Sequence, residues 1–244
     1  MNYVIVGASA GVGRALAYQF ARAGHNLVVA ASDARDLEAT ASDLRIRCGV
    51  QVTPVVMDLA RIEETALRQI EQAAADWGGL HGLLLPAGAV SPDDTANAAA
   101  GEFDRLTRVN YLSMASVIQR LLPLLQGHPA VIVGFGSVAA MRGRGRNVAY
   151  AAAKRALESY FESLRHAFSN TDLKVQFYVL GYMNTQMAFG MRTPLPKADP
   201  GKLSRVVLAN VARDIGVVYY PRFWRLMHWV VRSIPWPLYK RMQF

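Results

Sequence analysis

Three residues in the second half of the chain have the types and the spacing needed for proton transfer. Ser137 precedes Tyr150 by thirteen positions, and Lys154 follows Tyr150 by four. The alanine-rich segment that holds Tyr150 and Lys154 predicts a helix, and an i,i+4 pair lies on one face of a helix. A neighbouring ammonium stabilises a phenolate, so this arrangement predicts a tyrosine that works as an acid or base.

The segment between Ser137 and Tyr150 contains three arginines separated by single glycines. They are Arg142, Arg144 and Arg146, in the sequence MRGRGRN. Arginine binds phosphate through paired, charge-assisted hydrogen bonds, and the glycines would let such a loop close on an anion. This pattern favours an anionic substrate. A solvated loop or a contact between subunits explains the same pattern equally well.

A glycine-rich turn near the N-terminus predicts a nucleotide site. The sequence VGASAGVGR places Gly7, Gly11 and Gly13 between an apolar strand and a helix, with Ser9 and Val12 in the same turn. Glycines there let the backbone approach a pyrophosphate, and the N–H groups at the helix start favour an anion. The alternative is a tight turn that needs glycine only for steric reasons.

The ends of the next two strands supply candidate contacts to the rest of a nucleotide. Ser32 stands where an acid would read a ribose, and it favours NADPH, with help from Arg35 or Arg14; NADH remains the alternative. Asp33 is expected to cap the following helix. Asp58 could accept a hydrogen bond from adenine or cap a helix that begins at residue 61.

Length and pattern indicate one α/β domain over residues 1–244. The chain is 52% hydrophobic and 18% charged, enough to bury a full core. Apolar strands alternate with helical segments, which predicts a doubly wound parallel sheet of about seven strands. Strands are expected at 3–6, 26–31, 50–57, 80–88, 130–136, 173–181 and 216–220, and helices at 12–23, 34–48, 61–77, 101–125, 148–168 and 202–213, with a loop containing MRTPLP between.

The composition restricts the cellular compartment and the kinds of binding partner that we expect. The single cysteine, Cys48, excludes an internal disulfide and a cysteine-based metal cluster, which favours a reducing, cytoplasmic setting. We expect no signal peptide and no membrane-spanning helix, because no uncharged run reaches about 18 residues. The net charge of +9 accompanies no nucleic-acid-binding pattern, so a nucleic-acid partner is not expected.

The C-terminal segment, residues 221–244, is basic and aromatic. It contains three tryptophans and five Lys/Arg residues and no acid. Trp224, Met227, Val231 and Ile234 recur at helical spacing, which predicts an amphipathic helix that ends near Pro235. Such a helix suits a membrane interface, a lid over an apolar channel, or packing on its own domain or another subunit.

Together these motifs resemble the short-chain dehydrogenase/reductase family over almost the whole chain. The resemblance rests on the order and spacing of the glycine turn, Asp58-Leu59, Asn110, the Ser137/Tyr150/Lys154 set and Leu180–Thr185. Two segments depart from the family pattern. Leu85-Pro86-Ala87-Gly88 replaces its usual N-N-A-G, and Leu180-Gly181 replaces its usual Pro-Gly.

The resemblance implies a role for each of these residues in reducing a carbonyl with NAD(P)H. Tyr150 would be the acid/base, Ser137 would orient the carbonyl, and Lys154 would lower the tyrosine pKa and hold the nicotinamide ribose. Asn110, which by itself could be a solvent-facing helix residue, would interrupt its helix to hold a relay water. Thr185 would bind the carboxamide, with Ala87 and Gly88 lining the cofactor. A homodimer or homotetramer through helices 101–125 and 148–168 is also implied.

The arginine loop and the C-terminal segment carry a narrower resemblance. They are similar to reductases that complete decaprenylphosphoryl arabinose synthesis, which act on a 2-keto-sugar carried by a polyprenyl phosphate. This likeness implies a lipid-phosphate-linked keto-sugar and a peripheral membrane contact through residues 221–244. Two alternatives stay open from the residues alone: a dehydrogenase of a hydrophobic alcohol, and a non-catalytic dinucleotide-binding scaffold.

Overall fold

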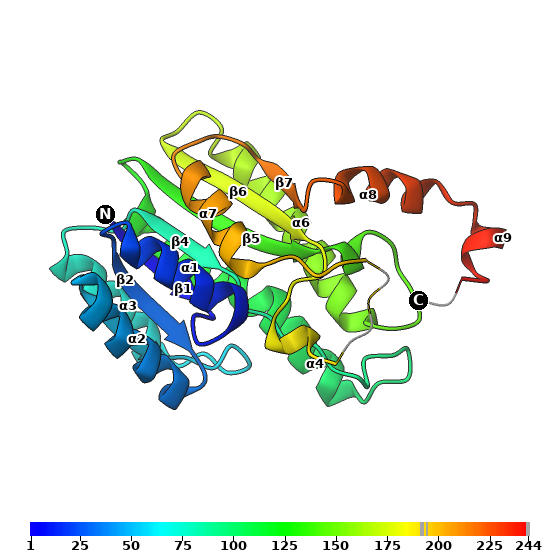
Figure 1. Ribbon diagram of the computed structural model, residues 1–244, viewed down its shortest axis with the longest axis horizontal. Coiled ribbons are helices and arrows are strands. Elements are labelled where there is room, and N and C mark those ends of the chain that lie inside the picture. The colour runs from blue at the N-terminus through cyan, green and yellow to red at the C-terminus, as the bar shows by residue number, and fades with distance from the viewer. Residues whose placement is uncertain (191–192, 194, 243–244) are drawn as a thin grey trace.

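The computed structural model describes residues 1–190, 193 and 195–242. Within them a seven-stranded sheet is flanked by helices (Figure 1). Its strands are β1 (Asn2–Val6), β2 (Asn26–Ala31), β3 (Val52–Val56), β4 (Gly82–Leu85), β5 (Ala130–Ser137), β6 (Leu173–Leu180) and β7 (Val217–Tyr220). The helices are α1 (Gly11–Arg22), α2 (Ala34–Cys48), α3 (Glu64–Asp76), α4 (Ala100–Thr107), α5 (Ser113–Leu121), α6 (Val148–Ala167), α7 (Pro200–Asn210), α8 (Trp224–Ser233) and α9 (Trp236–Tyr239).

The sheet is parallel throughout, in the order β3-β2-β1-β4-β5-β6-β7. The direction of winding reverses between β1 and β4, so the loops after these two strands separate. In open sheets of this kind the crevice at such a reversal is where ligands bind. The predicted doubly wound fold is therefore confirmed.

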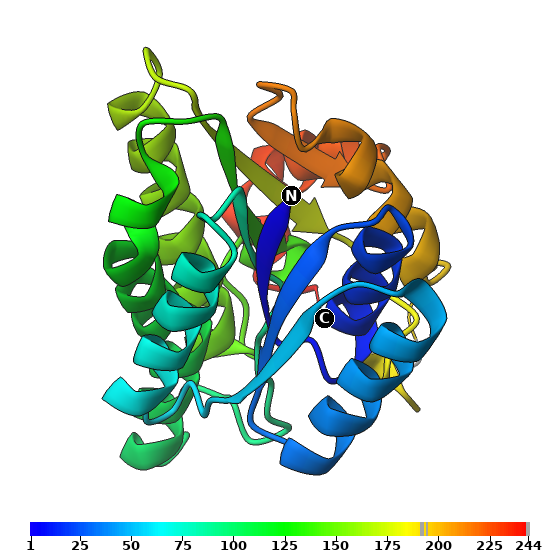
Figure 2. The ribbon, with the colours of Figure 1, turned by 90° about the vertical axis from the view of Figure 1, so that its left-hand side faces the viewer.

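Helices cover both faces of the sheet (Figure 2). A layer of buried apolar side chains holds each set against the strands. One face is covered by α1, α2 and α7, with Leu16, Phe20 and Leu203 fully buried against the strands. The other face is covered by α3, α5 and α6, with Ile70 and Phe161 buried there. Because both faces are covered, the strands are apolar along their length instead of alternating.

The expected elements agree closely with the observed ones, with differences at their ends. The helix expected at 61–77 begins only at Glu64, and the helix expected at 101–125 is divided into four segments. Its centre is a π-helical turn, Arg108–Leu112, and it ends in the 3₁₀ turn Leu122–Leu125, which contains Pro123. Proline lacks the N–H that a continuing α-helix needs, which accounts for the change at that end. In the expected 191–196 loop, Met191, Arg192 and Pro194 lie outside the described residues.

The chain after β7 forms an arm, defined here as residues 221–242. Figure 1 shows its two helices, α8 and α9, extending to one side of the sheet. The expected amphipathic helix is present as α8, and Ile234 follows its end. The short helix α9 was not expected from the sequence, although proline at its first turn is favourable for helix initiation. None of the helices in the described part of the chain has the length and apolar character needed to cross a membrane.

Candidate active site

A cavity of about 710 Å³ opens at the carboxyl ends of the strands. It runs from the turn after β1 to the segment after β6, and the arm closes one side of it. Most of the predicted site residues line it: Gly7, Ser9, Gly11, Val12, Gly13, Ser32, Asp58, Leu59, Ala87, Gly88, Ser137, Arg142, Arg144, Tyr150, Lys154 and Thr185. Asn110 and Arg146 are not among the residues that line it.

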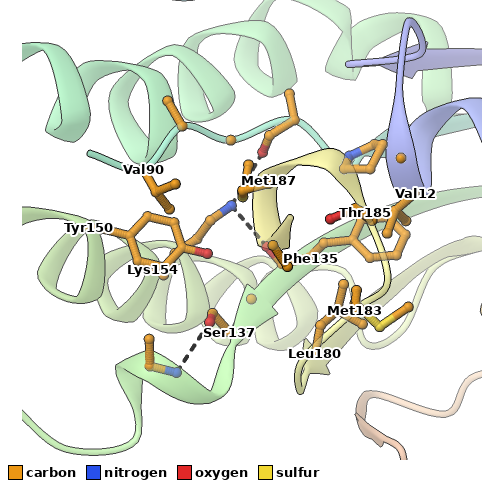
Figure 3. Close-up of a pocket in the computed structure, with 18 of the residues that line it drawn as sticks. Val12, Val90, Phe135, Ser137, Tyr150, Lys154, Leu180, Met183, Thr185 and Met187 are labelled. Atoms are coloured by element: carbon orange, nitrogen blue, oxygen red, sulfur yellow. Dashed lines mark hydrogen bonds between the residues drawn. The ribbon is translucent and has the colours of Figure 1, made fainter. Parts of the chain in front are cut away.

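Ser137, Tyr150 and Lys154 meet in this cavity (Figure 3). Ser137 ends β5, while Tyr150 and Lys154 lie one turn apart on α6. The hydroxyl of Ser137 accepts the N–H of Ala139 at 3.1 Å and is also hydrogen-bonded to the phenol of Tyr150. A hydroxyl pair of this kind can bind one carbonyl oxygen from two sides.

The Lys154 ammonium is buried and is fixed by backbone carbonyls. Its Nζ donates to the carbonyl of Phe135 at 3.1 Å and to that of Ala87 at 3.3 Å. Burial lowers the pKa of Lys154 to about 8, because desolvation disfavours the charged form. The lysine therefore ties the ends of β4 and β5 to α6.

The sequence predicts a lowered pKa for Tyr150, whereas its surroundings in the structure raise that pKa. Burial raises the pKa of this phenol, while its hydrogen bond with Ser137 and the charge of Arg144 oppose that rise. The ammonium of Lys154 donates to backbone carbonyls and not to the phenol. Arg144, in the glycine-spaced loop, is a cation that favours the ionised form of Tyr150.

Asn110 is fully buried at the π-helical turn, so the solvent-facing alternative is wrong. Its side chain accepts the N–H of Ala89 at 3.1 Å and donates to the carbonyls of Ala89 at 2.8 Å and Leu106 at 2.9 Å. The interruption of the helix was expected. At this interruption the Asn110 side chain holds the loop after β4. The same loop contains Gly88, and a Cβ placed there would lie 2.9 Å from Asn110 Oδ1 and 3.3 Å from Lys154 Nζ.

Asp94 is a site residue that sequence reasoning missed. It is 1% exposed, and its carboxylate accepts the N–H groups of Ala149 at 2.8 Å and Tyr150 at 2.9 Å. Its carbonyl accepts the N–H of Asn147 at 2.8 Å. Asn147, at the N-cap position of α6, has φ of 56° and makes no side-chain cap. A remote carboxylate therefore caps this helix, and no local pattern could have revealed it.

The glycine turn has the shape that a nucleotide pyrophosphate requires. Gly7 has φ of 95°, and a Cβ there would lie 2.7 Å from Ala87, so the turn after β1 packs directly on the loop after β4. The first turn of α1 faces the cavity without an acid or a side-chain cap. Its free N–H groups fit a bound phosphate group. The methyl of Thr185 lies across the turn, 3.1 Å from a Cβ built on Gly11.

Ser32 follows β2 and is exposed at the cavity. Asp33 caps α2 by accepting the N–H of Asp36 at 2.9 Å, as expected, which leaves Ser32 at the cavity. Arg14 donates to the carbonyl of Ser9 and lies 3.5 Å from Asp36. The Nε of Arg14 is buried and has no hydrogen-bond partner among the described residues. Asp58 does not cap α3; it accepts the N–H of Ala60 at 2.8 Å within its own turn.

The three loop arginines occupy different places. The guanidinium of Arg142 donates to the carbonyls of Val231 at 2.8 Å and Ile234 at 2.6 Å, and lies 3.9 Å from the ring centre of Tyr239. Arg142 thus binds the arm. Arg144 lines the cavity near Tyr150, and its buried Nε has no partner within the described residues. Arg146 is exposed.

The arm gives the cavity an apolar wall. Trp224, Met227 and Val231, spaced by three and four residues on α8, line it. A Cβ on Gly181 would lie 1.9 Å from the indole nitrogen of Trp224, so only glycine permits this contact. Leu180-Gly181 stands where the family has Pro-Gly, and it retains the glycine that the contact with Trp224 requires.

Comparison with known proteins agrees with this geometry. A family model described as short chain dehydrogenase matches residues 2–194. A hydroxysteroid 11-beta-dehydrogenase 1-like protein of Macaca fascicularis is 31% identical, over 96% of this chain and 84% of that protein. The chain belongs to the short-chain dehydrogenase family, and the prediction of an oxidoreductase of this family is confirmed.

Two solved structures share the fold. A short-chain dehydrogenase from Sphingobium yanoikuyae in complex with NADPH has a TM-score of 0.78 at 24% identity, covering 99% of this chain and 96% of that one. A bulky-bulky ketone specific alcohol dehydrogenase from Comamonas testosteroni has a TM-score of 0.78 at 22% identity, covering 96% and 95%. The likeness extends over the sheet and its helices.

Proposed function

We propose that this protein reduces a carbonyl group with NADPH, using Tyr150 as the proton donor. The observation that carries the proposal is that Ser137, Tyr150 and Lys154 share one cavity with the glycine turn. A dinucleotide on that turn would reach from Ser32 to Lys154 through residues that all line the same cavity. When bound, its nicotinamide supplies a hydride to the carbonyl carbon.

The chain's own residues provide the proton and its path. Ser137 and Tyr150 hydrogen-bond the carbonyl oxygen, and Tyr150 transfers its phenolic proton to that oxygen as the carbon is reduced. The raised pKa of Tyr150 keeps it protonated for this step at neutral pH. Lys154 would hold the nicotinamide ribose, and Thr185 would hold the carboxamide. The proton that restores Tyr150 would come from solvent by way of Lys154, through a water beside Asn110.

We favour NADPH over NADH because of the groups around Ser32. A serine at this position does not repel a 2′-phosphate as an acid would, and Asp33 is engaged in capping α2. Arg14, whose buried Nε has no hydrogen-bond partner among the described residues, would supply positive charge on this side of the site. The Sphingobium yanoikuyae structure, which is in complex with NADPH, supports the same choice.

For the substrate we propose a keto compound with an anionic group, of the kind found in a lipid-phosphate-linked keto-sugar. Arg144 faces the cavity with a buried donor that lacks a partner, and a buried unpaired guanidinium donor is costly unless a ligand satisfies it. The apolar wall of α8 would contact the rest of the molecule. Arg142 supports this wall instead of binding the anion.

A hydrophobic ketone or alcohol is the second candidate. The apolar side chains at the cavity, including Val90, Met187 and Trp224, favour it, as do the names of the Macaca and Comamonas proteins. On this alternative Arg144 acts only on Tyr150. Membership of an enzyme family and the presence of Ser137, Tyr150 and Lys154 in one cavity argue against the scaffold alternative.

Steady-state oxidation of NADPH and of NADH tests these proposals together. The substrates would be a neutral bulky ketone and a keto compound of similar size that carries a phosphate. We expect a higher kcat/KM with NADPH and with the anionic ketone. Equal turnover with NADH would overturn the cofactor assignment, and a preference for the neutral ketone would favour the second candidate.

A further inference from the structure

The arm presents two different apolar faces. One face of α8 carries Trp224, Met227 and Val231 and lines the cavity. The opposite face carries Leu226, which is 69% exposed, and Trp229, which is 67% exposed. A helix that packs only on its own domain would present polar residues on that outer side. The outer face therefore needs a separate explanation.

The exposed apolar side chains of α8 form a strip along one side of the helix. Phe223, Leu226 and Val230 follow at intervals of three and four residues, with Trp229 beside them, so they lie on one side of α8. The short helix α9 adds two more exposed apolar side chains, Trp236, which is 64% exposed, and Leu238. We call this strip the outer face of the arm.

Basic residues border the outer face without acidic partners. Five of the 27 Lys/Arg residues and none of the 18 Asp/Glu residues lie in 221–244. All five are exposed: Arg222, Arg225, Arg232, Lys240 and Arg241. Among the described residues no salt bridge joins any of them to an acid, whereas arginines of α1, α2 and α3 have acidic partners.

The arm is fastened so that this face points away from the body. Arg142 holds the C-terminal end of α8 by donating hydrogen bonds to the carbonyls of Val231 and Ile234. The hydroxyl of Tyr239 donates to the carbonyl of Gly143 at 2.9 Å. Near the start of α8, Tyr219 and His228 share a hydrogen bond of 3.2 Å. These contacts are made by the inner side of the arm, so the outer face is exposed to solvent.

We propose that the outer face of the arm docks on an anionic lipid bilayer. Tryptophan and leucine side chains partition into the interfacial region, and the bordering arginines and lysine attract anionic headgroups. A second copy fits this face poorly. A two-fold contact sets the same patch against itself, and it would bring the five cations of one arm against those of the other.

Docking in this way would place the cavity about 10 Å from the lipid, because only the thickness of α8 separates the two faces. A substrate with a long apolar chain could then present its head to Ser137 and Tyr150 without leaving the membrane. The docking itself goes beyond the proposed function, since it needs neither a particular substrate nor a bound cofactor.

Co-sedimentation with vesicles tests the proposal. The full chain would be mixed with phosphatidylcholine vesicles with or without phosphatidylglycerol, at low and at high salt. We expect binding to the anionic vesicles that weakens with salt. Each basic residue at an anionic surface contributes about fivefold in partitioning, so Arg225→Ser/Arg232→Ser should weaken binding about twentyfold or more. Leu226→Ser/Trp229→Ser should weaken it at least tenfold.

Matched variants away from the arm separate docking from general surface effects. Ile46 is 83% exposed on α2, and Val56 is exposed on β3. Ile46→Ser/Val56→Ser and Arg61→Ser/Arg213→Ser should bind vesicles like the unchanged protein. Reduction of a water-soluble ketone should be unaffected by Leu226→Ser/Trp229→Ser, since neither side chain lines the cavity.

Three results would overturn the proposal. The first is no binding to anionic vesicles, and the second is equal sedimentation of the arm variants and their controls. The third is a smaller oligomer for Leu226→Ser/Trp229→Ser by light scattering, which would assign the outer face to a second copy. None of these results bears on the reductase assay, so failure of docking and failure of the proposed function remain distinguishable.

Discussion

The carboxylate of Asp94 accepts the backbone N–H of Tyr150 at 2.9 Å, although 56 positions separate the two residues. A second bond, from the N–H of Ala149 at 2.8 Å, makes the contact bidentate. The position of the tyrosine therefore depends on the loop that follows β4. That loop also carries Ala87 and Ala89, which bind Lys154 and Asn110.

Removing this cap should impair catalysis more than cofactor binding. In Asp94→Ala, two buried N–H groups at the start of α6 lose their acceptor, which costs about 1–3 kcal/mol of stability. We expect kcat to fall at least tenfold, because Tyr150 shifts from its position, with little change in the Kd of NADPH. The measurements are steady-state kinetics and a fluorescence titration with NADPH.

Asp94→Asn and Asp93→Ala are the controls for a positioning role. The asparagine keeps an acceptor oxygen and should restore most of kcat, whereas exposed Asp93 should be neutral. If Asp94→Ala lost stability but kept its kcat, Asp94 would be a structural residue only.

Much of the fold could be predicted from sequence because its elements are encoded locally. The strand at Asn26–Ala31 and the helix at Ala34–Cys48 have the expected bounds. The apolar run and the cap at Asp33 are both visible within a few residues. The grouping of Ser137, Tyr150 and Lys154 in one cavity was also expected, from spacing and family resemblance.

The missed features depend on contacts between distant segments. Asp94 caps a helix that begins more than 50 residues later, and Arg142 binds an arm about 90 residues away. Arg142, Arg144 and Arg146 have equivalent sequence surroundings, and only their packing in the folded protein distinguishes their roles. Assembly through helices 101–125 and 148–168 stays a prediction, which exposed Phe103 and Leu112 would suit.

Arg144 and Arg146 should differ in their effect on an anionic substrate. Arg144 lines the cavity and Arg146 does not, so Arg144→Ala should raise KM for a phosphate-bearing ketone about tenfold or more. Arg146→Ala should leave KM within twofold. Equal effects of the two substitutions, or no effect of either, would contradict the anion site; kcat with a neutral ketone is the companion measurement.

The buried ammonium of Lys154 should make stability depend on pH. Its pKa falls from 10.5 to about 8 on folding, so the unfolded chain binds more protons between these values. The free energy of unfolding should therefore rise with pH across that window, by about 3 kcal/mol relative to Lys154→Met, which cannot titrate there. Below about pH 8 the cost of burying the charge is fully present.

Urea unfolding at several pH values measures this difference. Lys202→Met is the control, since Lys202 is exposed on α7, and its difference from the unchanged protein should be flat with pH. A flat difference for Lys154→Met as well would show that the ammonium is not desolvated.

Arg142 should hold the arm against the body. Arg142→Ala removes two hydrogen bonds to the end of α8 and the contact with the Tyr239 ring. We expect limited proteolysis to cleave the arm several times faster, with loss of the apolar wall and a raised KM for bulky ketones. Arg146→Ala should be cleaved at the original rate; equal rates for both variants would refute the role of Arg142.

The most direct test of the account is Tyr150→Phe, assayed for NADPH oxidation with a ketone and for NADPH binding by fluorescence. Phenylalanine fills the same space but has no proton to give. The account predicts that kcat falls by about a thousandfold or more, in line with the loss of a general acid, while the Kd of NADPH stays within about threefold. Near-native turnover in Tyr150→Phe would contradict it.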